Sequence, residues 1–163
     1  MTEQHLHEQV ASYLIAQYPG VVFRSDLGGY KDRHTSVQKV RGYPDLTILE
    51  PTKGKHGLLL ELKDGYSKLF RQDGIPAKSR RRSHTEQAAT LWFLHYRKGY
   101  LTDFATSFEE AQKIINNYLC PYTRTWIPGH YQEFLDRMYI DLPWNLQQYL
   151  DHSMIYEYWT FRN

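Results

Sequence analysis

The chain contains a single cysteine, no long apolar run and no internal repeat. Cys120 therefore has no partner for an internal disulfide, which is typical of a reducing compartment. No stretch approaches the roughly 20 apolar residues that a membrane-spanning helix requires. The N-terminus opens on polar and acidic residues, without the basic and then apolar pattern of a signal peptide. These absences predict an intracellular, cytoplasmic protein with no membrane partner.

Signatures of several functional classes are also missing. The chain has no glycine-rich phosphate loop, dinucleotide-binding turn or zinc knuckle, so no nucleotide cofactor is expected. The eight histidines form no metal-binding pattern, and both His5 and His7 are expected at the surface, on different faces of a helix. A net charge of +2 is too small by itself to indicate a nucleic-acid partner, so the distribution of charge must decide.

What is present begins with two short apolar segments, residues 45–50 and 58–62, joined by a polar loop rich in glycine and lysine. They predict two buried strands of an antiparallel hairpin. Asp45 opens the first segment, while Glu61 and Lys63 close the second. In an antiparallel pair these ends are neighbours, and alternation places Glu61 and Lys63 on one face. The pattern predicts that two carboxylates and one amine meet at the rim of the sheet.

Such a group suits a divalent metal. Asp45 and Glu61 offer the hard oxygen ligands that Mg²⁺ prefers, and the backbone carbonyl of Leu62 would add a third oxygen. Lys63 would stand beside an attacking water as an orienting cation or, with its pKa lowered by the metal, as a general base. A Pro-Asp pair and a Glu-Leu-Lys tripeptide each occur by chance, but their position at adjacent strand ends favours a catalytic site.

The other elements complete an α/β order of helix, three strands, helix, strand and helix. Apolar spacing and capping residues predict helices over 2–18, 83–98 and 107–119, and strands over 21–24 and 100–106. Residues 121–163 differ in kind, because aromatic residues and two prolines crowd them. They are expected to form a mainly helical extension, with helices near 130–139 and 145–156, that packs on the core or on a dimer partner.

Four short segments together resemble the VRR-NUC family, a branch of the PD-(D/E)xK nuclease superfamily. They are Gly-Tyr-Pro-Asp at 42–45, Glu-Leu-Lys at 61–63, the segment 83–87 and Gly-Tyr at 99–100. The resemblance implies a restriction-endonuclease-like mixed sheet flanked by helices, an αβββαβ core, over residues 1–120. It also implies Mg²⁺ dependence, with Mn²⁺ as a substitute, and cleavage of DNA. Stand-alone members, often encoded by bacteria or phages, resemble homodimeric, structure-specific endonucleases with Holliday junctions among their substrates.

Residue by residue, the resemblance matches Asp45 and Glu61 to the metal-binding acids and Lys63 to the catalytic lysine. It matches Gln87 to a glutamine that faces the site from the following helix. Gln87 also has an ordinary interpretation as an exposed residue in the first turns of that helix.

The family also places a glutamate on the first helix, and this chain offers Glu3 and Glu8. At about 100° per residue, Glu3 falls on the stripe of Leu6 and Val10, whereas Glu8 falls nearly opposite it. Glu3 is therefore preferred as a metal ligand and Glu8 is the alternative. Either residue would also be unremarkable as a solvated helix carboxylate.

Basic residues gather between the second hairpin strand and the helix that begins at Ser83. They are Lys68, Arg71, Lys78, Arg80, Arg81 and Arg82. Their place beside a phosphate-cleaving site predicts contacts to the DNA backbone, which position DNA without reading its bases. Such contacts suit recognition of DNA shape or of a junction.

Two other functions fit the same residues. One is a non-catalytic nucleic-acid-binding module, although such a module has no need of the complete set of two acids and a lysine. The other is a nuclease subunit of a larger restriction or repair assembly, with residues 122–163 as its docking surface. A calorimetric titration with Mg²⁺ addresses the first alternative. The mass in solution after deletion of 122–163 addresses the second.

Overall fold

The structure is a computed structural model, and it describes residues 2–25, 43–65 and 83–122. Its elements are α1 (Glu3–Gln17), β1 (Phe23–Ser25), β2 (Leu46–Ile48), β3 (Leu58–Leu62), α2 (Ser83–Lys98), β4 (Leu101–Ala105) and α3 (Phe108–Leu119). The predicted order of elements is confirmed. Within the described ranges, no helix has both the length and the apolar character needed to cross a membrane.

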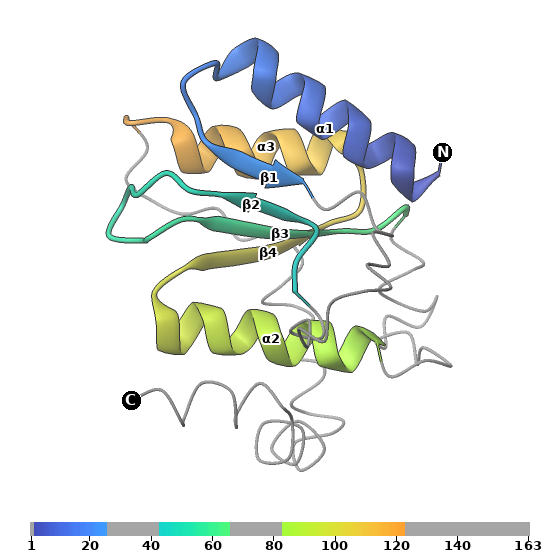
Figure 1. Ribbon diagram of the computed structural model, residues 1–163, viewed down its shortest axis with the longest axis vertical. Coiled ribbons are helices and arrows are strands. Elements are labelled where there is room, and N and C mark those ends of the chain that lie inside the picture. The colour runs from blue at the N-terminus through green and yellow to red at the C-terminus, as the bar shows by residue number, and fades with distance from the viewer. Residues whose placement is uncertain (1, 26–42, 66–82, 123–163) are drawn as a thin grey trace, which may run out of the picture.

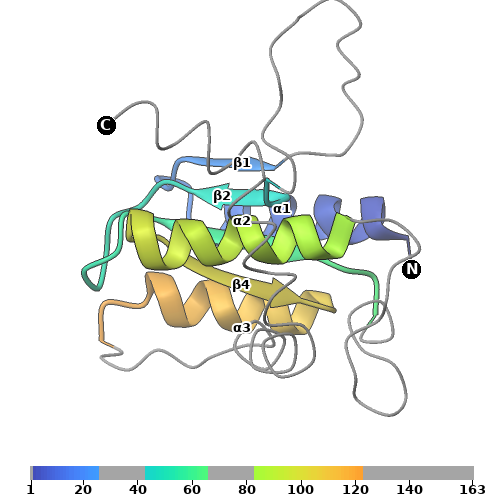
Figure 2. The same ribbon diagram turned by 90° about the horizontal axis from the view of Figure 1, so that it is seen from below.

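The four strands form one mixed sheet in the order β1-β2-β3-β4. Strand β2 pairs antiparallel with both β1 and β3, as the predicted hairpin requires, whereas β3 and β4 are parallel. The parallel pair is connected by way of α2, since parallel neighbours need a long crossover. Helices α1 and α3 cover one face of the sheet and α2 covers the other (Figures 1 and 2). The expected α/β class, a mixed sheet flanked by helices, is confirmed.

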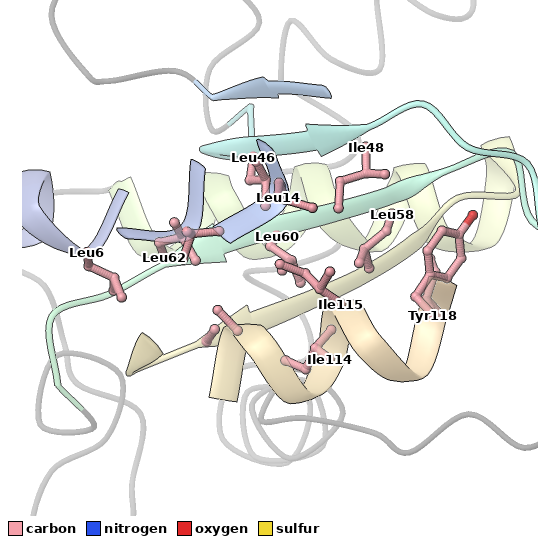
Figure 3. Close-up of a cluster of buried hydrophobic side chains, with 14 residues drawn as sticks. Leu6, Leu14, Leu46, Ile48, Leu58, Leu60, Leu62, Ile114, Ile115 and Tyr118 are labelled. Atoms are coloured by element: carbon pink, nitrogen blue, oxygen red, sulfur yellow. The ribbon is translucent and has the colours of Figure 1, made fainter. Parts of the chain in front are cut away.

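The core lies between the sheet and the pair of helices α1 and α3 (Figure 3). Strand β3 is buried along its whole length, because helices cover both of its faces. Its residues Leu58, Leu60 and Leu62 belong to the α1–α3 core. Because side chains alternate along a strand, Leu59 and Glu61 lie on the opposite face, which α2 covers.

Local capping sets where α1 begins. The side chain of Thr2 accepts a hydrogen bond from the backbone N–H of His5 at 3.3 Å, which satisfies one of the free donors of the first turn. Leu6, Val10 and Leu14 then recur at helical spacing and are almost completely buried against the sheet. This start brings the first two turns of α1 to the end of the sheet where β3 finishes (Figure 1).

The loop between β2 and β3 is held at the other end of the sheet. Lys53 and Gly54 adopt positive φ angles of 53° and 72°, which close the tight connection. The Tyr118 hydroxyl donates to the Glu50 carbonyl at 2.7 Å, and the Lys53 amine donates to the Asn117 carbonyl. These contacts tie the loop to α3 and help to maintain the pairing of β2 with β3.

The first strand lies slightly later than predicted. The sequence favours 21–24, whereas β1 comprises Phe23–Ser25. The reason is that the Val21 N–H bonds to the Tyr18 carbonyl at 3.0 Å and closes the turn after α1. Pairing then begins with Phe23 opposite Ile48.

The helices predicted near 130–139 and 145–156, and the extension as a whole, lie outside the described residues.

Gly57, at the start of β3, offers a test of the β2–β3 pairing. A Cβ at this position would lie 2.5 Å from the Ile48 carbonyl oxygen, so one strand must shift to admit it. We expect Gly57→Ala to lower the free energy of unfolding by about 1–3 kcal/mol, measured by urea denaturation. Gly20→Ala is the matched control, because a Cβ there meets nothing within 4 Å. Equal stability of the two variants would contradict this account.

Candidate metal-binding active site

Several chain segments converge at one end of the sheet. The end of β3, the start of β2, the first turns of α1 and the first turns of α2 all lie on the same side of the molecule (Figure 1). The register pairs Leu46 with Leu60 across the antiparallel strands. One position further out, this register places Asp45 opposite Glu61. Pairing alone therefore brings the two predicted acids together.

Asp45 is held by the end of β3. Its Oδ2 accepts the backbone N–H of Leu62 at 2.8 Å and lies 3.8 Å from Nε2 of His7. Since the N–H and C=O of a residue in an extended strand point the same way, the Leu62 carbonyl also lies on the Asp45 side of β3. The Asp45 side chain is 18% exposed, so solvent reaches it.

Glu61 and Lys63 form a buried ion pair. The Lys63 amine donates to Glu61 Oε1 at 2.5 Å, and the Glu61 side chain is 0% exposed. This contact confirms that both side chains lie on one face of β3. The other carboxylate oxygen, Glu61 Oε2, is buried and has no hydrogen-bond partner among the described residues. A buried carboxylate oxygen without a partner is costly, so this atom is suited to a bound cation.

Burial dominates the electrostatics of the site. It raises the pKa of Glu61 from 4.5 to about 8, with a further increase from the charge of Asp45 and an opposing effect of Lys63. Burial also raises the pKa of Asp45, although Lys63 and the Leu62 N–H oppose the rise. For Lys63, burial acts to lower the pKa, but the neighbouring carboxylates outweigh it and the pKa is raised. In the metal-free protein, burial thus disfavours the state in which both carboxyl groups are ionised.

On the α1 side of Asp45 lies a second group of potential ligands. One ligand atom from each of Glu3, His7 and Asp45 lies within 4.8 Å of the other two. Glu3 is exposed, so the group opens to solvent, whereas His7 is buried. The expectation of a surface position is correct for His5 and wrong for His7. His7 faces inward because it shares the buried side of α1 with Leu6 and Val10.

The position of His7 beside Glu3 is indicated by their spacing in the sequence. His7 follows Glu3 by four residues, and residues at this spacing are neighbours on one side of a helix.

Glu8 is placed differently. It is exposed, and its Oε1 accepts a hydrogen bond from Gln4 Nε2 at 3.0 Å along the helix surface. The described structure thus brings Glu3, and not Glu8, to Asp45.

Gln87 lies in the first turns of α2, the helix that covers the Glu61 face of the sheet. It is half-buried, and its buried Oε1 has no hydrogen-bond partner in the ranges that the structure describes. A polar atom in this condition is available to a ligand or a water.

The six basic residues predicted to contact DNA, from Lys68 to Arg82, lie outside the described residues.

The donor set fits a hard divalent cation. Asp45 and Glu61 contribute carboxylate oxygens, one of them without a partner, and the Leu62 carbonyl adds a neutral oxygen nearby. Mg²⁺ is commonly held by one or two carboxylates together with waters and substrate phosphate oxygens. A cation bound here would also relieve the repulsion between the two acids.

Comparison with known proteins supports the fold. No family model matches the chain, and no curated protein matches it. Among solved structures, one described as a VRR_NUC domain protein is similar to this chain, with 19% sequence identity and a TM-score of 0.50. The similarity covers 73% of this chain and 88% of that one. It shows a shared α/β, restriction-endonuclease-like fold, in agreement with the sheet and helices described above.

The raised pKa of Glu61 predicts a pH-dependent stability for the metal-free protein. Between pH 4.5 and about 8 the unfolded chain loses this proton while the folded protein keeps it. The contribution of Glu61 to the free energy of unfolding should therefore be fully present below this window and decrease as the pH rises through it. Glu61→Gln removes this titration, so we expect a smaller decrease in the free energy of unfolding across the window.

Urea denaturation in EDTA at several pH values measures this effect. The control is Glu109→Gln, which replaces an exposed carboxylate in the first turn of α3 and should preserve the parental pH dependence. If Glu61→Gln shows the same decrease as the parent protein, the burial effect assigned to Glu61 is wrong.

Proposed function

We propose that the protein is a metal-dependent endodeoxyribonuclease that hydrolyses the phosphodiester bonds of DNA. The observation that supports this most is the convergence of Asp45, Glu61 and Lys63 at one end of a buried sheet, where no other described residue pairs with Glu61 Oε2. The similarity of fold to a VRR_NUC domain protein is consistent with the proposal. So is the resemblance of the four sequence segments.

In this proposal, Asp45, Glu61 and the Leu62 carbonyl hold Mg²⁺, with Glu3 as a further ligand and Mn²⁺ as a substitute ion. When bound, the divalent cation neutralises phosphate oxygens and acidifies the attacking water. The chain's own contribution is to hold both carboxylates close together, with Glu61 fully buried and Asp45 mostly so. Burial strengthens each electrostatic interaction there, because the effective dielectric is lower than in bulk solvent.

Lys63 acts as a positioned cation. Its raised pKa keeps the amine protonated at neutral pH, so in the metal-free protein it is a donor and a positive charge rather than a base. Its contact with Glu61 fixes the amine beside the place where phosphate charge increases. Gln87, on the helix over the same face, orients the substrate or the water. In-line attack then leaves a 5′-phosphate and a 3′-hydroxyl, as the family resemblance implies.

DNA binding is assigned to the basic segment that contains Lys68, Arg71, Lys78 and residues 80–82. Contacts from these residues to phosphates position the duplex without reading the bases. This arrangement suits a structure-specific enzyme that acts on branched DNA. A homodimer, as the resemblance implies, would offer two such sites to the two strands of a junction.

Substitutions that preserve volume test the catalytic assignment. We expect Glu61→Gln and Lys63→Met each to reduce Mg²⁺-dependent DNA cleavage by at least about 100-fold, because each removes charge at the reacting phosphate. Binding of DNA without Mg²⁺, measured by fluorescence anisotropy, should change little. Lys113→Met, which alters an exposed lysine on α3, is the control and should keep full activity.

Two outcomes of that experiment would contradict the proposal. Cleavage that persists in both folded variants would show that the chemistry lies elsewhere. DNA binding by the parent protein without cleavage under any divalent cation would favour a non-catalytic binding module.

The preferred DNA structure requires a separate experiment. We expect a four-way junction to be cut faster than a linear duplex of the same sequence, because phosphate contacts read shape rather than bases. A panel of junction, flap, single-stranded and duplex DNA, each with Mg²⁺ and with Mn²⁺, measures this by gel electrophoresis. Equal rates on junction and duplex would refute structure specificity and leave the nuclease assignment intact.

A further inference from the structure

His7 has an environment that its position on a surface helix does not explain. The side chain is 4% exposed, and its buried Nδ1 has no hydrogen-bond partner within the described part of the chain. Its Nε2 lies 3.8 Å from Asp45 Oδ2, which is beyond hydrogen-bond distance. Buried polar side chains are nearly always hydrogen-bonded, since an unpaired group loses its water without compensation. Of the two ring nitrogens of this buried side chain, Nε2 is thus the one that lies beside Asp45, at a distance that leaves room for a bridging cation.

The positions of Glu3, His7 and Asp45 show where a cation bound to His7 would lie. Glu3 and His7 are four residues apart on α1, so their side chains share one side of the helix. Asp45 comes from a different part of the chain, just before β2. The ligand atoms of all three residues lie within 4.8 Å of one another, a span that one bound cation can bridge. The exposed Glu3 leaves a route from solvent to this position.

We propose that His7 is a direct metal ligand and that Glu3, His7 and Asp45 together bind a first-row transition-metal dication in preference to Mg²⁺. Imidazole nitrogen is a good ligand for such ions, whereas Mg²⁺ prefers oxygen throughout. A nitrogen donor beside two carboxylates thus favours Mn²⁺ or a later ion of the series. The inference deepens the proposed function, because it assigns the metal preference of the same site.

The other role available to His7 is that of a protonated charge partner for Asp45. In that case the imidazolium would repel a cation, and substitution of His7 would strengthen metal binding. Direct ligation predicts the opposite effect. It also predicts a spectroscopic coupling between the metal and a ring nitrogen, which an ion pair with Asp45 does not produce.

Pulsed electron paramagnetic resonance of the full-length protein loaded with Mn²⁺ tests the ligation. We expect nitrogen modulation from a bound imidazole in the parent protein, and a changed pattern when its histidines carry ¹⁵N. His5→Gln alters an exposed histidine on the same helix and should keep the signal. His7→Gln should abolish it. Absence of the signal from the parent protein, or its persistence in His7→Gln, would overturn the proposal.

Calorimetric titration tests the preference between ions. We expect the parent to bind Mn²⁺ more tightly than Mg²⁺, and His7→Gln to weaken Mn²⁺ binding by about tenfold or more with a smaller effect on Mg²⁺. Glu3→Gln should weaken binding of both ions, because it removes an oxygen ligand from an exposed position that the fold does not require. Tighter Mn²⁺ binding in His7→Gln than in the parent would support the charge-partner role and refute ligation.

These readouts separate the inference from the proposed function. Metal binding and nitrogen coupling are measured without DNA, so they stand even if no substrate is cut. Conversely, an active Mg²⁺-dependent nuclease without nitrogen coupling to Mn²⁺ would retain the proposed function and lose the role of His7. Thermal unfolding of metal-free His7→Gln checks its fold, and the ¹⁵N measurement on the parent protein needs no substitution.

Discussion

The antiparallel pairing of β2 with β3 is the constraint on which the candidate site depends. Its register places Leu46 opposite Leu60 and so brings Asp45 beside Glu61. The register is strongly specified, because a slip by one residue would exchange the two faces of a strand. Leu58, Leu60 and Leu62 would then leave the core, and Glu61 would enter it. Apolar burial on one face thus positions the charged side chains on the other.

Burial of a carboxylate and an amine is costly, and here the cost has a chemical consequence. The Lys63 amine offsets part of the charge of Glu61 but satisfies one oxygen only. The pKa of Glu61 is raised to about 8 because burial and the charge of Asp45 both disfavour a second carboxylate. The same forces that favour a proton would favour a divalent cation, which carries more charge. Within the described residues, the electrostatics of the site are therefore compatible with a bound divalent cation.

Helix α1 contributes to the site from outside the sheet. Leu6, Val10 and Leu14 anchor it to the core, and this packing determines which of its polar residues reach Asp45. Glu3 and His7 do so because they share the inward side of the first two turns, whereas Glu8 remains in solvent. The helix therefore has two structural roles, since the contacts that cover the sheet also place the Glu3 and His7 side chains at its end.

The sequence alone determined the order of the elements and most of their boundaries, since periodicity and capping are local properties. The α3 cap at Ser107 was predictable for this reason. The grouping of Asp45, Glu61 and Lys63 was predictable because a short loop joins two adjacent apolar segments, which favours a hairpin. The burial of His7 was not, because a histidine beside an apolar stripe is compatible with either solvent or core. The start of β1 also depended on a contact between Val21 and Tyr18. Only tertiary packing decided these features, because the free energy of a buried polar side chain depends on neighbours that are distant in the sequence.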